Sequence, residues 1–333
     1  MESDISDKGE RSEIPPPAHP QIRREPLPWH APKSLQEDPE ALKNVRVIMD
    51  SPSYRLAIED PVFQAKDDTR GIRLQLDYLK PERFLVEHGV FHTVVVFGST
   101  RIVEPQAAEA RVVELRRTLS QSPDDKALCG RLAVAERVLR NSRYYEAARD
   151  FARIVGEAGG GPGDSRLVVM TGGGPGIMEA VNRGAHDAGA KSVGLNIDLP
   201  HEQYPNPYIT PGLCFRFHYF ALRKLHFMRR ARALIAFPGG FGTMDELFET
   251  LTLIQTRKIK PVPVILVGRS FWERAIDFDF LIAEGVIDAE DRELFWYAES
   301  AEDIWDGLLC WYRRNGEGLI EGYDGPFSCP KED

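Results

Sequence analysis

The sequence has few cysteines, no long hydrophobic run and no excess of positive charge. Its four cysteines lie far apart without a C-x-x-C pair, at Cys129, Cys214, Cys310 and Cys329. This spacing predicts neither a disulfide framework nor a zinc ribbon. No stretch approaches the roughly 18 apolar residues that span a bilayer, and the N-terminus lacks the apolar core of a signal peptide. We therefore expect a cytoplasmic protein with reduced cysteines and no membrane contact.

The charge balance is acidic. Lys and Arg total 42 while Asp and Glu total 51, which gives a net charge of −9 over 333 residues. This balance opposes nonspecific binding to nucleic acid or to anionic lipid. With 42% hydrophobic and 28% charged residues, the composition is that of a globular protein with a sizeable core. A small-molecule ligand is the expected partner.

Three regions are predicted from changes in composition. Residues 1–90 form an N-terminal extension, in which 1–35 are polar and proline-rich and predict an extended arm, followed by short helices. Residues 91–270 form the core, with a helical insertion at about 102–161 whose first half is predicted to be a helical hairpin. Residues 271–333 are rich in aromatics and are expected to pack on the core as helices.

Five apolar runs rich in β-branched residues predict buried strands. They are TVVVFGST from Thr93, LVVMTGG from Leu167, SVGLNI from Ser192, ALIAFPGG from Ala233 and PVPVILVG from Pro261. Because helical patterns separate these runs, the predicted fold is α/β, a Rossmann-like doubly wound parallel sheet flanked by helices. Ligands of such sheets bind beyond the carboxyl ends of the strands.

Small-residue loops follow three of the runs. The first loop contains Gly98, Ser99 and Thr100, which could offer backbone N–H groups and a hydroxyl to a nucleotide; taken alone, a tight turn explains it better. The second loop is TGGGPGIME from Thr171, and its glycines are Gly172, Gly173, Gly174 and Gly176. It predicts phosphate binding, with Pro175 starting the next helix. It is not the dinucleotide fingerprint, which needs glycine where Ile177 stands, and it lacks the Lys-Ser/Thr pair of a P-loop.

The third loop is PGGFGTMDE from Pro238. Its glycines are Gly239, Gly240 and Gly242. Thr243 is predicted to cap the following helix and to offer its hydroxyl to a phosphate. Two interpretations of Glu246 are open, because a carboxylate at this position can take part in catalysis or complete a capping box with Thr243.

A cationic helix is predicted just before the strand that leads into the third loop. One stripe would hold Phe217, Ala221, Leu225 and Met228, and the opposite face Arg223, His226 and Arg230. A run of this kind is usually a solvated face. Its place in the chain nevertheless allows at least one arginine to reach a bound anion.

These motifs resemble the LOG (Lonely Guy) phosphoribohydrolases, in their long form, which are often labelled lysine decarboxylases. The family is defined by GGG-x-x-G-x-M and PGG-x-GT-x-x-E. The second segment is present from Pro238, and GGGPGIM from Gly172 resembles the first with one residue fewer between its glycines. The Arg223-Lys224 pair lies at the family's position between them, although the usual preceding Glu is Leu222. The stretch GLNIDLPHEQYPNPY from Gly194 is similar to the longer members.

The resemblance implies an enzyme that hydrolyses the N-glycosidic bond of a nucleoside 5′-monophosphate, AMP or a cytokinin riboside 5′-monophosphate, to free base and ribose 5-phosphate. It implies catalytic roles for Arg223 and Glu246. Substrate contacts are expected from the glycine loops and Lys224, and the assembly would be a homodimer or a higher homo-oligomer.

No cofactor and no metal are expected. Pyridoxal phosphate chemistry needs a Schiff-base lysine with an acidic partner for the ring nitrogen, and no such set is evident. His88 and His92 have helical spacing, but Gly89 intervenes and no H-E-x-x-H motif is present. Two alternatives remain: a noncatalytic nucleotide or molybdenum-cofactor carrier of similar fold, and a dinucleotide-dependent oxidoreductase, which the missing G-x-G-x-x-G disfavours.

Overall fold

A computed structural model describes residues 14–27, 31–159, 164–200, 204–320, 322–323, 325 and 329. The chain divides into two compact units, Met1–Arg70 and Gly71–Asp333. No helix within the described ranges combines the length and apolar character that a membrane crossing requires.

Among its described residues, the first unit contains short helices. The α-helices are α1 (Ala41–Met49) and α2 (Pro61–Gln64), and neither buries a side chain. Three single-turn 3-10 helices accompany them, Pro52–Tyr54, Ala57–Glu59 and Asp67–Thr69. The described residues before position 36 form no helix or strand, and the extended, proline-rich arm stays a prediction; residues 1–13 and 28–30 lie outside the described part. A segment of this composition buries too little apolar surface to form its own core.

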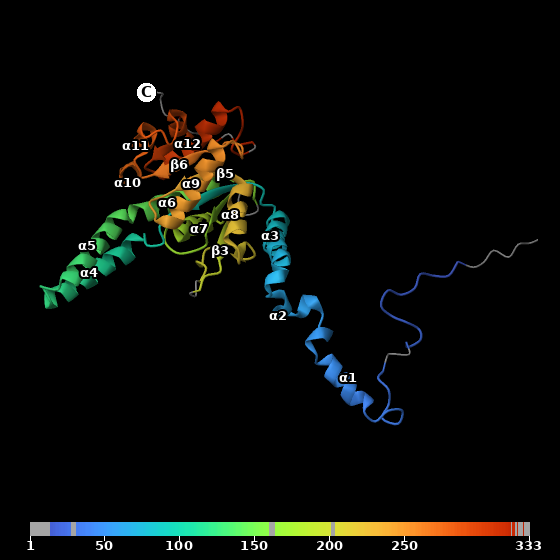
Figure 1. Ribbon diagram of the computed structural model, residues 1–333. Coiled ribbons are helices and arrows are strands. Elements are labelled where there is room, and N and C mark those ends of the chain that lie inside the picture. Colours follow the sequence, from blue (N-terminus) through green and yellow to red (C-terminus); the bar gives the residue numbers. More distant parts are fainter. Residues whose placement is uncertain are drawn as a thin grey trace, which may run out of the picture. The chain divides into compact units, whose positions relative to one another are not determined.

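The second unit is built on a seven-stranded sheet in the order β4-β3-β2-β1-β5-β6-β7, and Figure 1 shows helices packed around it. The strands are β1 (Thr93–Phe97), β2 (Val168–Thr171), β3 (Ser192–Ile197), β4 (Cys214–Phe217), β5 (Ala231–Ala236), β6 (Val264–Val267) and β7 (Phe295–Ala298). Every neighbouring pair runs parallel. The predicted Rossmann-like α/β fold is confirmed.

Alternate residues of β1 point into two different cores. Val94 and Val96 belong to one core, and Val95 and Phe97 belong to the other. The first core includes side chains of α6 (Arg143–Ala158), α7 (Ile177–Asp187) and α12 (Ala301–Arg314). The second includes side chains of α3 (Arg70–Glu87), α8 (Phe220–Arg229), α9 (Phe241–Gln255), α10 (Arg269–Ala275) and α11 (Phe278–Ala283). A strand covered on both faces must be apolar on both, which explains its unbroken hydrophobic run.

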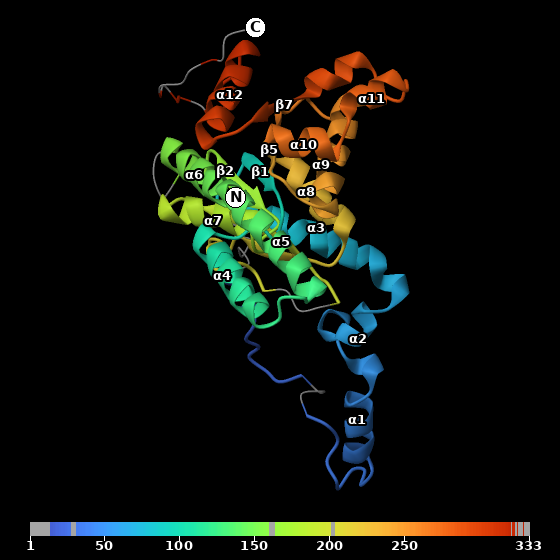
Figure 2. The same cartoon turned by 90° about the vertical axis from the view of Figure 1, so that its left-hand side faces the viewer.

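The insertion between β1 and β2 is helical, as predicted. Its first part is a hairpin of α4 (Pro105–Gln121) and α5 (Lys126–Asn141), which lie side by side in Figures 1 and 2. Val112, Leu115 and Ala135 form its small core. The side chain of Asp125 begins α5 by accepting from the backbone N–H groups of the next turn.

Two strands escaped prediction. β4 is a four-residue edge strand whose side chains alternate between exposed and buried, so it lacks the continuous apolar run of the inner strands. β7 forms the other edge and lies inside the aromatic segment that was expected to be helical. The prediction for residues 271–333 was therefore incomplete, since the helices α10, α11 and α12 are joined by a strand.

A disulfide also escaped prediction. Cys310 on α12 is bonded to Cys329, and their Cα atoms are 5.6 Å apart. Sequence spacing does not show that the chain after α12 returns to that helix, so the expectation of unpaired cysteines was wrong for this pair. Cys129 and Cys214 are free thiols. The reducing compartment inferred from the cysteines loses this support and stays a prediction.

Candidate active site

The three predicted loops meet at one edge of the sheet. β1 pairs with β2 on one side and with β5 on the other, so the strand order reverses beside β1, where open α/β sheets bind ligands. The Ser99 N–H donates to the Pro238 oxygen at 3.0 Å, and the Ile177 N–H donates to the Ser99 oxygen at 3.1 Å. These bonds join the loops that follow β1, β2 and β5 into one candidate site.

The first two loops need small residues for their own packing. Gly176 has a φ of +74°, and a β-carbon there would collide with the backbone oxygen of Ser99. A β-carbon at Gly98 would lie 2.7 Å from the Ile177 side chain. Pro175 was predicted to start α7, but the helix begins at Ile177 with Gly176 as its N-cap residue. Close packing between loops therefore explains glycine at both positions without a ligand.

Two buried asparagines hold the second loop in place. Asn206 donates through Nδ2 to the Gly174 oxygen at 3.1 Å and to Asn182 Oδ1 at 2.9 Å, and its backbone N–H donates to the Gly173 oxygen at 2.9 Å. Thr171 Oγ1 lies 2.8 Å from the same Asn182 oxygen. Neither asparagine was predicted from the sequence, although Asn206 lies in the stretch that resembles the longer LOG members.

The third loop leaves its backbone open. α9 begins at Phe241 after Gly240, which is an N-cap residue without a side-chain cap. The Thr243 N–H bonds to the Gly240 oxygen at 3.1 Å, so the N–H groups of Phe241 and Gly242 have no partner within the helix. A β-carbon at Gly240 or Gly242 would meet no atom within 4 Å. Two such donors at a helix N-terminus suit an anion such as phosphate.

Thr243 is not a helix cap, contrary to the prediction. Its side chain lies against Gly239 inside the first turn of α9. Because the helix begins before Thr243, Glu246 stands beyond the first turn and no capping box joins the two residues. The interpretation of the Thr-x-x-Glu spacing as a capping box is therefore excluded.

Glu246 is a buried carboxylate with no partner. Its residue is 7% exposed, and its side chain makes no hydrogen bond or ion pair with any other residue that the structure describes. Burial raises its pKa from 4.5 to about 7, against the opposing effect of the positive charges of Lys224 and Arg223. A carboxylate in this setting titrates near neutral pH and is available to a ligand.

Arg223 lies close enough to Glu246 for each charge to influence the other. They form no ion pair within 4.0 Å. The guanidinium carbon is 5.3 Å from the Phe227 ring centroid and 5.9 Å from that of Phe220, and its buried Nε has no hydrogen-bond partner among the described residues. Burial lowers the pKa of Arg223, while Glu246 and Asp245 oppose that change. Both members of the predicted catalytic pair are therefore free to bind a ligand.

Lys224 joins α8 to α9. Its Nζ lies 2.9 Å from an oxygen of Asp245 and 2.9 Å from an oxygen of Glu249. The predicted substrate contact of Lys224 is untested. In this structure its ammonium fixes the helix that carries Arg223 against the helix that carries Glu246.

The predicted division of α8 into two faces was wrong. Leu225 is 48% exposed, whereas His226 and Phe227 are fully buried. Arg230 is also buried and pairs with Glu82 of α3 at 2.8 Å. The helix lies against α3 and the sheet with a face rotated from the predicted one, so Arg223 is the only member of the expected cationic face that belongs to the candidate site. Phe217 precedes the helix and lies in β4.

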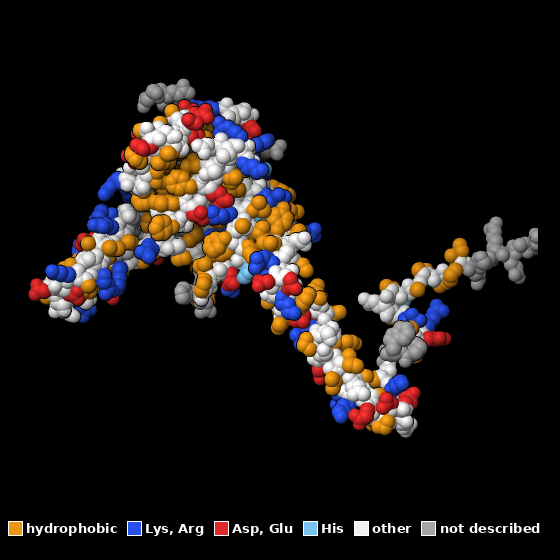
Figure 3. Space-filling view, viewed as in Figure 1, with side chains coloured by type: hydrophobic (Ala, Val, Ile, Leu, Met, Phe, Trp, Pro, Cys, Tyr) orange, Lys and Arg blue, Asp and Glu red, His pale blue; other side chains and the backbone are white. Residues whose placement is uncertain are grey.

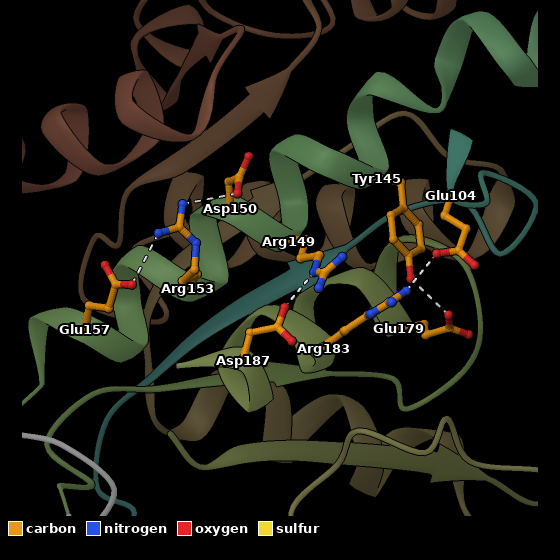
Figure 4. Close-up of polar contacts among 9 residues, drawn as sticks. All are labelled: Glu104, Tyr145, Arg149, Asp150, Arg153, Glu157, Glu179, Arg183 and Asp187. Carbon is orange, nitrogen blue, oxygen red and sulfur yellow. Dashed lines mark hydrogen bonds and ion pairs between the residues drawn. The ribbon is translucent and has the colours of Figure 1, made fainter. Parts of the chain in front are cut away.

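Polar contacts link α7 to α6 and to the residue before α4 (Figure 4). The Tyr145 hydroxyl donates to Glu179 at 2.9 Å, and Arg183 pairs with Glu104 at 2.7 Å. Burial is the main cause that raises the pKa of Tyr145, to about 12. Glu179 ends the second motif, and its engagement with α6 gives it a packing role.

The comparisons with known proteins agree with the motifs. Residues 178–308 match the family described as "Possible lysine decarboxylase". The Oryza sativa subsp. japonica protein "Cytokinin riboside 5'-monophosphate phosphoribohydrolase LOG" is 30% identical over 169 residues, which are 50% of this chain and 66% of that protein. The Arabidopsis thaliana protein LOG4, with the same activity in its name, is 30% identical over 133 residues, 39% of this chain and 60% of that protein. The chain thus spans about 60 to 66% of the length of these two relatives.

Two solved structures are also similar. The structural genomics target TM1055 has a TM-score of 0.41 at 21% identity, covering 65% of this chain and 98% of that one. A molybdenum cofactor binding protein from Rippkaea orientalis has a TM-score of 0.32 at 18% identity, covering 50% of this chain and 85% of that one. From the family match over residues 178–308 and the curated relatives, the similarity of this chain to the LOG family, predicted from its two glycine motifs, is confirmed.

Proposed function

We propose that the protein hydrolyses the N-glycosidic bond of a nucleoside 5′-monophosphate, releasing a free base and ribose 5-phosphate. The proposal depends on the state of Glu246, which is a buried carboxylate without a partner. It lies near Arg223 and follows the first turn of α9, whose N-terminal backbone is open. The names of the relatives support this reaction class.

The start of α9 is proposed to hold the 5′-phosphate. The N–H groups of Phe241 and Gly242 and the Thr243 hydroxyl would donate to phosphate oxygens, aided by the positive end of the helix dipole. Since Glu246 stands on the same helix, phosphate binding at its N-terminus would bring the ribose toward that carboxylate. The loops after β1 and β2 would complete the pocket around the sugar.

Glu246 and Arg223 are proposed to share the chemistry. Cleavage of an N-glycosidic bond develops positive charge on the sugar ring, and an ionised carboxylate stabilises that charge or orients the attacking water. Arg223 would bind the phosphate or the departing base. In the second case it would stabilise the negative charge that develops on the base as the bond breaks. Each loss is expected to lower kcat by about 100-fold or more.

Lysine decarboxylation is disfavoured by the state of Lys224. Burial lowers its pKa, but hydrogen bonds with Asp245 and Glu249 outweigh that effect, and the pKa is raised. A lysine that forms a Schiff base must lose its proton, so this environment is the opposite of the one required.

A homo-oligomer with a contact near the site is also proposed. Several large apolar side chains on α8 and α9 are exposed, among them Phe220, Leu225, Phe241 and Phe248, and Figure 3 shows hydrophobic side chains on this side of the molecule. Exposed apolar side chains that gather on one side of a protein are a common feature of protein contacts. Light scattering after size-exclusion chromatography should give at least twice the mass of one chain.

A base-release assay tests the function. The full-length protein is incubated with AMP, isopentenyladenosine monophosphate and a panel of other nucleoside monophosphates, and free base is separated by chromatography. The Glu246→Gln and Arg223→Gln variants should no longer release free base. Glu302→Gln, which makes the same change as Glu246→Gln at an exposed residue of α12, should release it at the wild-type rate. Tight retention of a nucleotide or pterin cofactor without any base release would instead favour the carrier function.

A further inference from the structure

A basic cavity lies outside the candidate active site, between the end of α5, the start of α6 and α10. Its volume is about 430 Å³, within the range of small-molecule sites. Four arginines line it, Arg137, Arg140, Arg143 and Arg274, and among the described residues no Asp or Glu does. None of its lining residues belongs to the glycine loops or to the Arg223 and Glu246 pair.

The four arginines have no carboxylate partners. No ion pair within 4.0 Å involves any of them in the part of the chain that is described. Their neighbours along α6 behave differently: Arg149 pairs with Asp187 at 2.6 Å, and Arg153 pairs with Asp150 at 3.2 Å (Figure 4). All four arginines are exposed, and in a chain whose net charge is −9 they gather around one hollow without a counter-charge. Their like charges repel, although solvent screens part of that repulsion.

Helix ends account for only part of this cluster. Arg140 and Arg274 stand in the last turns of α5 and α10, where the helix dipole favours a cation. Arg143, however, is the first residue of α6, and a cation is disfavoured at that end. A bound anion would relieve the repulsion and would also suit the dipole at the start of α6.

The start of α6 supplies a second, independent feature. Its N-cap residue Ser142 does not cap the helix; the hydroxyl donates back to the Leu139 oxygen at 2.6 Å. The Tyr145 N–H bonds to the Ser142 oxygen at 2.9 Å, so the N–H groups of Arg143 and Tyr144 precede the first helical bond. The backbone donors at the start of α6 therefore belong to Arg143 and Tyr144, which both line the cavity.

Aromatic and uncharged polar side chains also line the cavity. Arg143 lies over the Tyr144 ring at 4.7 Å and donates to its hydroxyl at 2.8 Å. Phe271, Ser270 and Asn141 contribute a further ring, a hydroxyl and an amide to the lining. Guanidinium groups recognise phosphate through two parallel hydrogen bonds, and four of them carry more positive charge than one phosphate group balances.

We propose that this cavity binds a small ligand that carries two or more linked phosphate groups. Such a ligand would be either a free polyphosphate or the phosphate chain of a nucleotide, since both present the same anionic oxygens. The proposal is independent of the reaction proposed for Glu246, because the two sites share no residue.

Titration calorimetry on the full-length protein tests the proposal with tripolyphosphate, orthophosphate and ATP as probes. Tripolyphosphate should bind with one site per chain, at least tenfold more tightly than orthophosphate and more weakly as salt rises. Arg140→Gln/Arg274→Gln should weaken tripolyphosphate binding at least tenfold. Arg46→Gln/Arg117→Gln, which removes the same charge from exposed arginines elsewhere, should change it less than twofold.

The outcomes separate the sources and the competing explanations. Equal affinity for tripolyphosphate and ATP indicates recognition of the phosphate chain alone, whereas tighter ATP binding indicates that the rings of the cavity contact the nucleoside. Either result supports the proposal, provided that the Arg140 and Arg274 replacements weaken binding. Absence of saturable binding, equal weakening by both double variants, or tighter binding of a short oligonucleotide than of either small probe would overturn it.

Discussion

The Arg223 guanidinium lies directly against the backbone of Gly172: a β-carbon at Gly172 would stand 2.6 Å from Nη2 of that arginine. The second glycine loop thus provides the surface on which the proposed catalytic arginine rests. Glycine at this position is explained by the approach of a side chain from α8, so the loop positions Arg223 as well as lining the site.

Gly172→Ala should damage activity more than stability. The added methyl would meet Arg223 Nη2 and Met178 Sδ, both at the ends of flexible side chains, so they can move while the fold persists. We expect kcat for base release to fall at least tenfold and the midpoint of urea unfolding to change little.

Gly176→Ala provides the contrast. Here the methyl would meet the backbone oxygen of Ser99, and φ is +74°. The backbone itself would have to shift, which costs more than moving the end of a side chain. A loss of about 2 kcal/mol in the free energy of unfolding is expected. Equal stability losses in the two alanine variants would contradict this account of the loop.

Glu246→Gln should stabilise the protein more at neutral than at acidic pH. Because the folded-state pKa is about 7 against an ordinary 4.5, the folded protein holds a proton that the unfolded chain has released between these pH values. Wild-type stability should therefore fall as pH rises through this window, by up to about 3 kcal/mol, and the glutamine variant should escape that loss. Urea unfolding at pH 5, 6 and 8 measures the difference, and a gap that does not widen with pH would refute the burial of this charge.

The pH dependence of kcat/KM should show the same group. If the ionised carboxylate acts, the rate should rise with pH and level off above about 7. Lys224→Met removes a positive charge that favours the ionised form, so the inflection should move to higher pH. Lys258→Met, the same change at an exposed lysine beyond the end of α9, should leave the inflection in place; an identical shift in both variants would deny Lys224 this effect.

Glu82→Gln should destabilise the contact between α3 and α8. Hydrogen bonding with Arg230 is the first cause that lowers the pKa of Glu82 to about 2, and the Arg230 side chain is 7% exposed. The Arg230 Nε still donates to the Val90 oxygen at 2.9 Å, but the buried guanidinium loses its counter-charge, which should cost about 3 kcal/mol at pH 7. Since the lowered pKa stabilises the fold above about pH 4.5 and that effect fades toward pH 2, the difference between variant and wild type should shrink at pH 3 in urea unfolding; a constant difference would count against the ion pair.

The sequence was most informative where burial is continuous. The unbroken apolar runs at β1, β2 and β6 predicted inner strands, and the glycine loops that follow β1, β2 and β5 predicted where a ligand would bind. β4 was missed because only alternate residues of an edge strand are buried. On α8, charge and hydropathy misidentified the buried face, because His226 is accommodated by the Tyr78 backbone oxygen, 3.1 Å from its Nε2.

The chemistry of the loops was harder to predict than their position. The Thr243 and Glu246 spacing fits a capping box, and only the start of α9 at Phe241 rules it out. The unpaired state of Glu246 and the basic cavity beside α10 depend on which side chains meet in three dimensions, which motif spacing does not encode.

Purified wild-type protein and Glu246→Gln, each mixed with AMP and with isopentenyladenosine monophosphate, give the most direct test, with free base and ribose 5-phosphate quantified over time. We expect the wild type to release both products in equal amounts from at least one nucleotide. The variant should still bind the nucleotide, but its rate of release should be lower by about 100-fold or more. Release by the two proteins at equal rates, or no release from any nucleoside monophosphate, would contradict it.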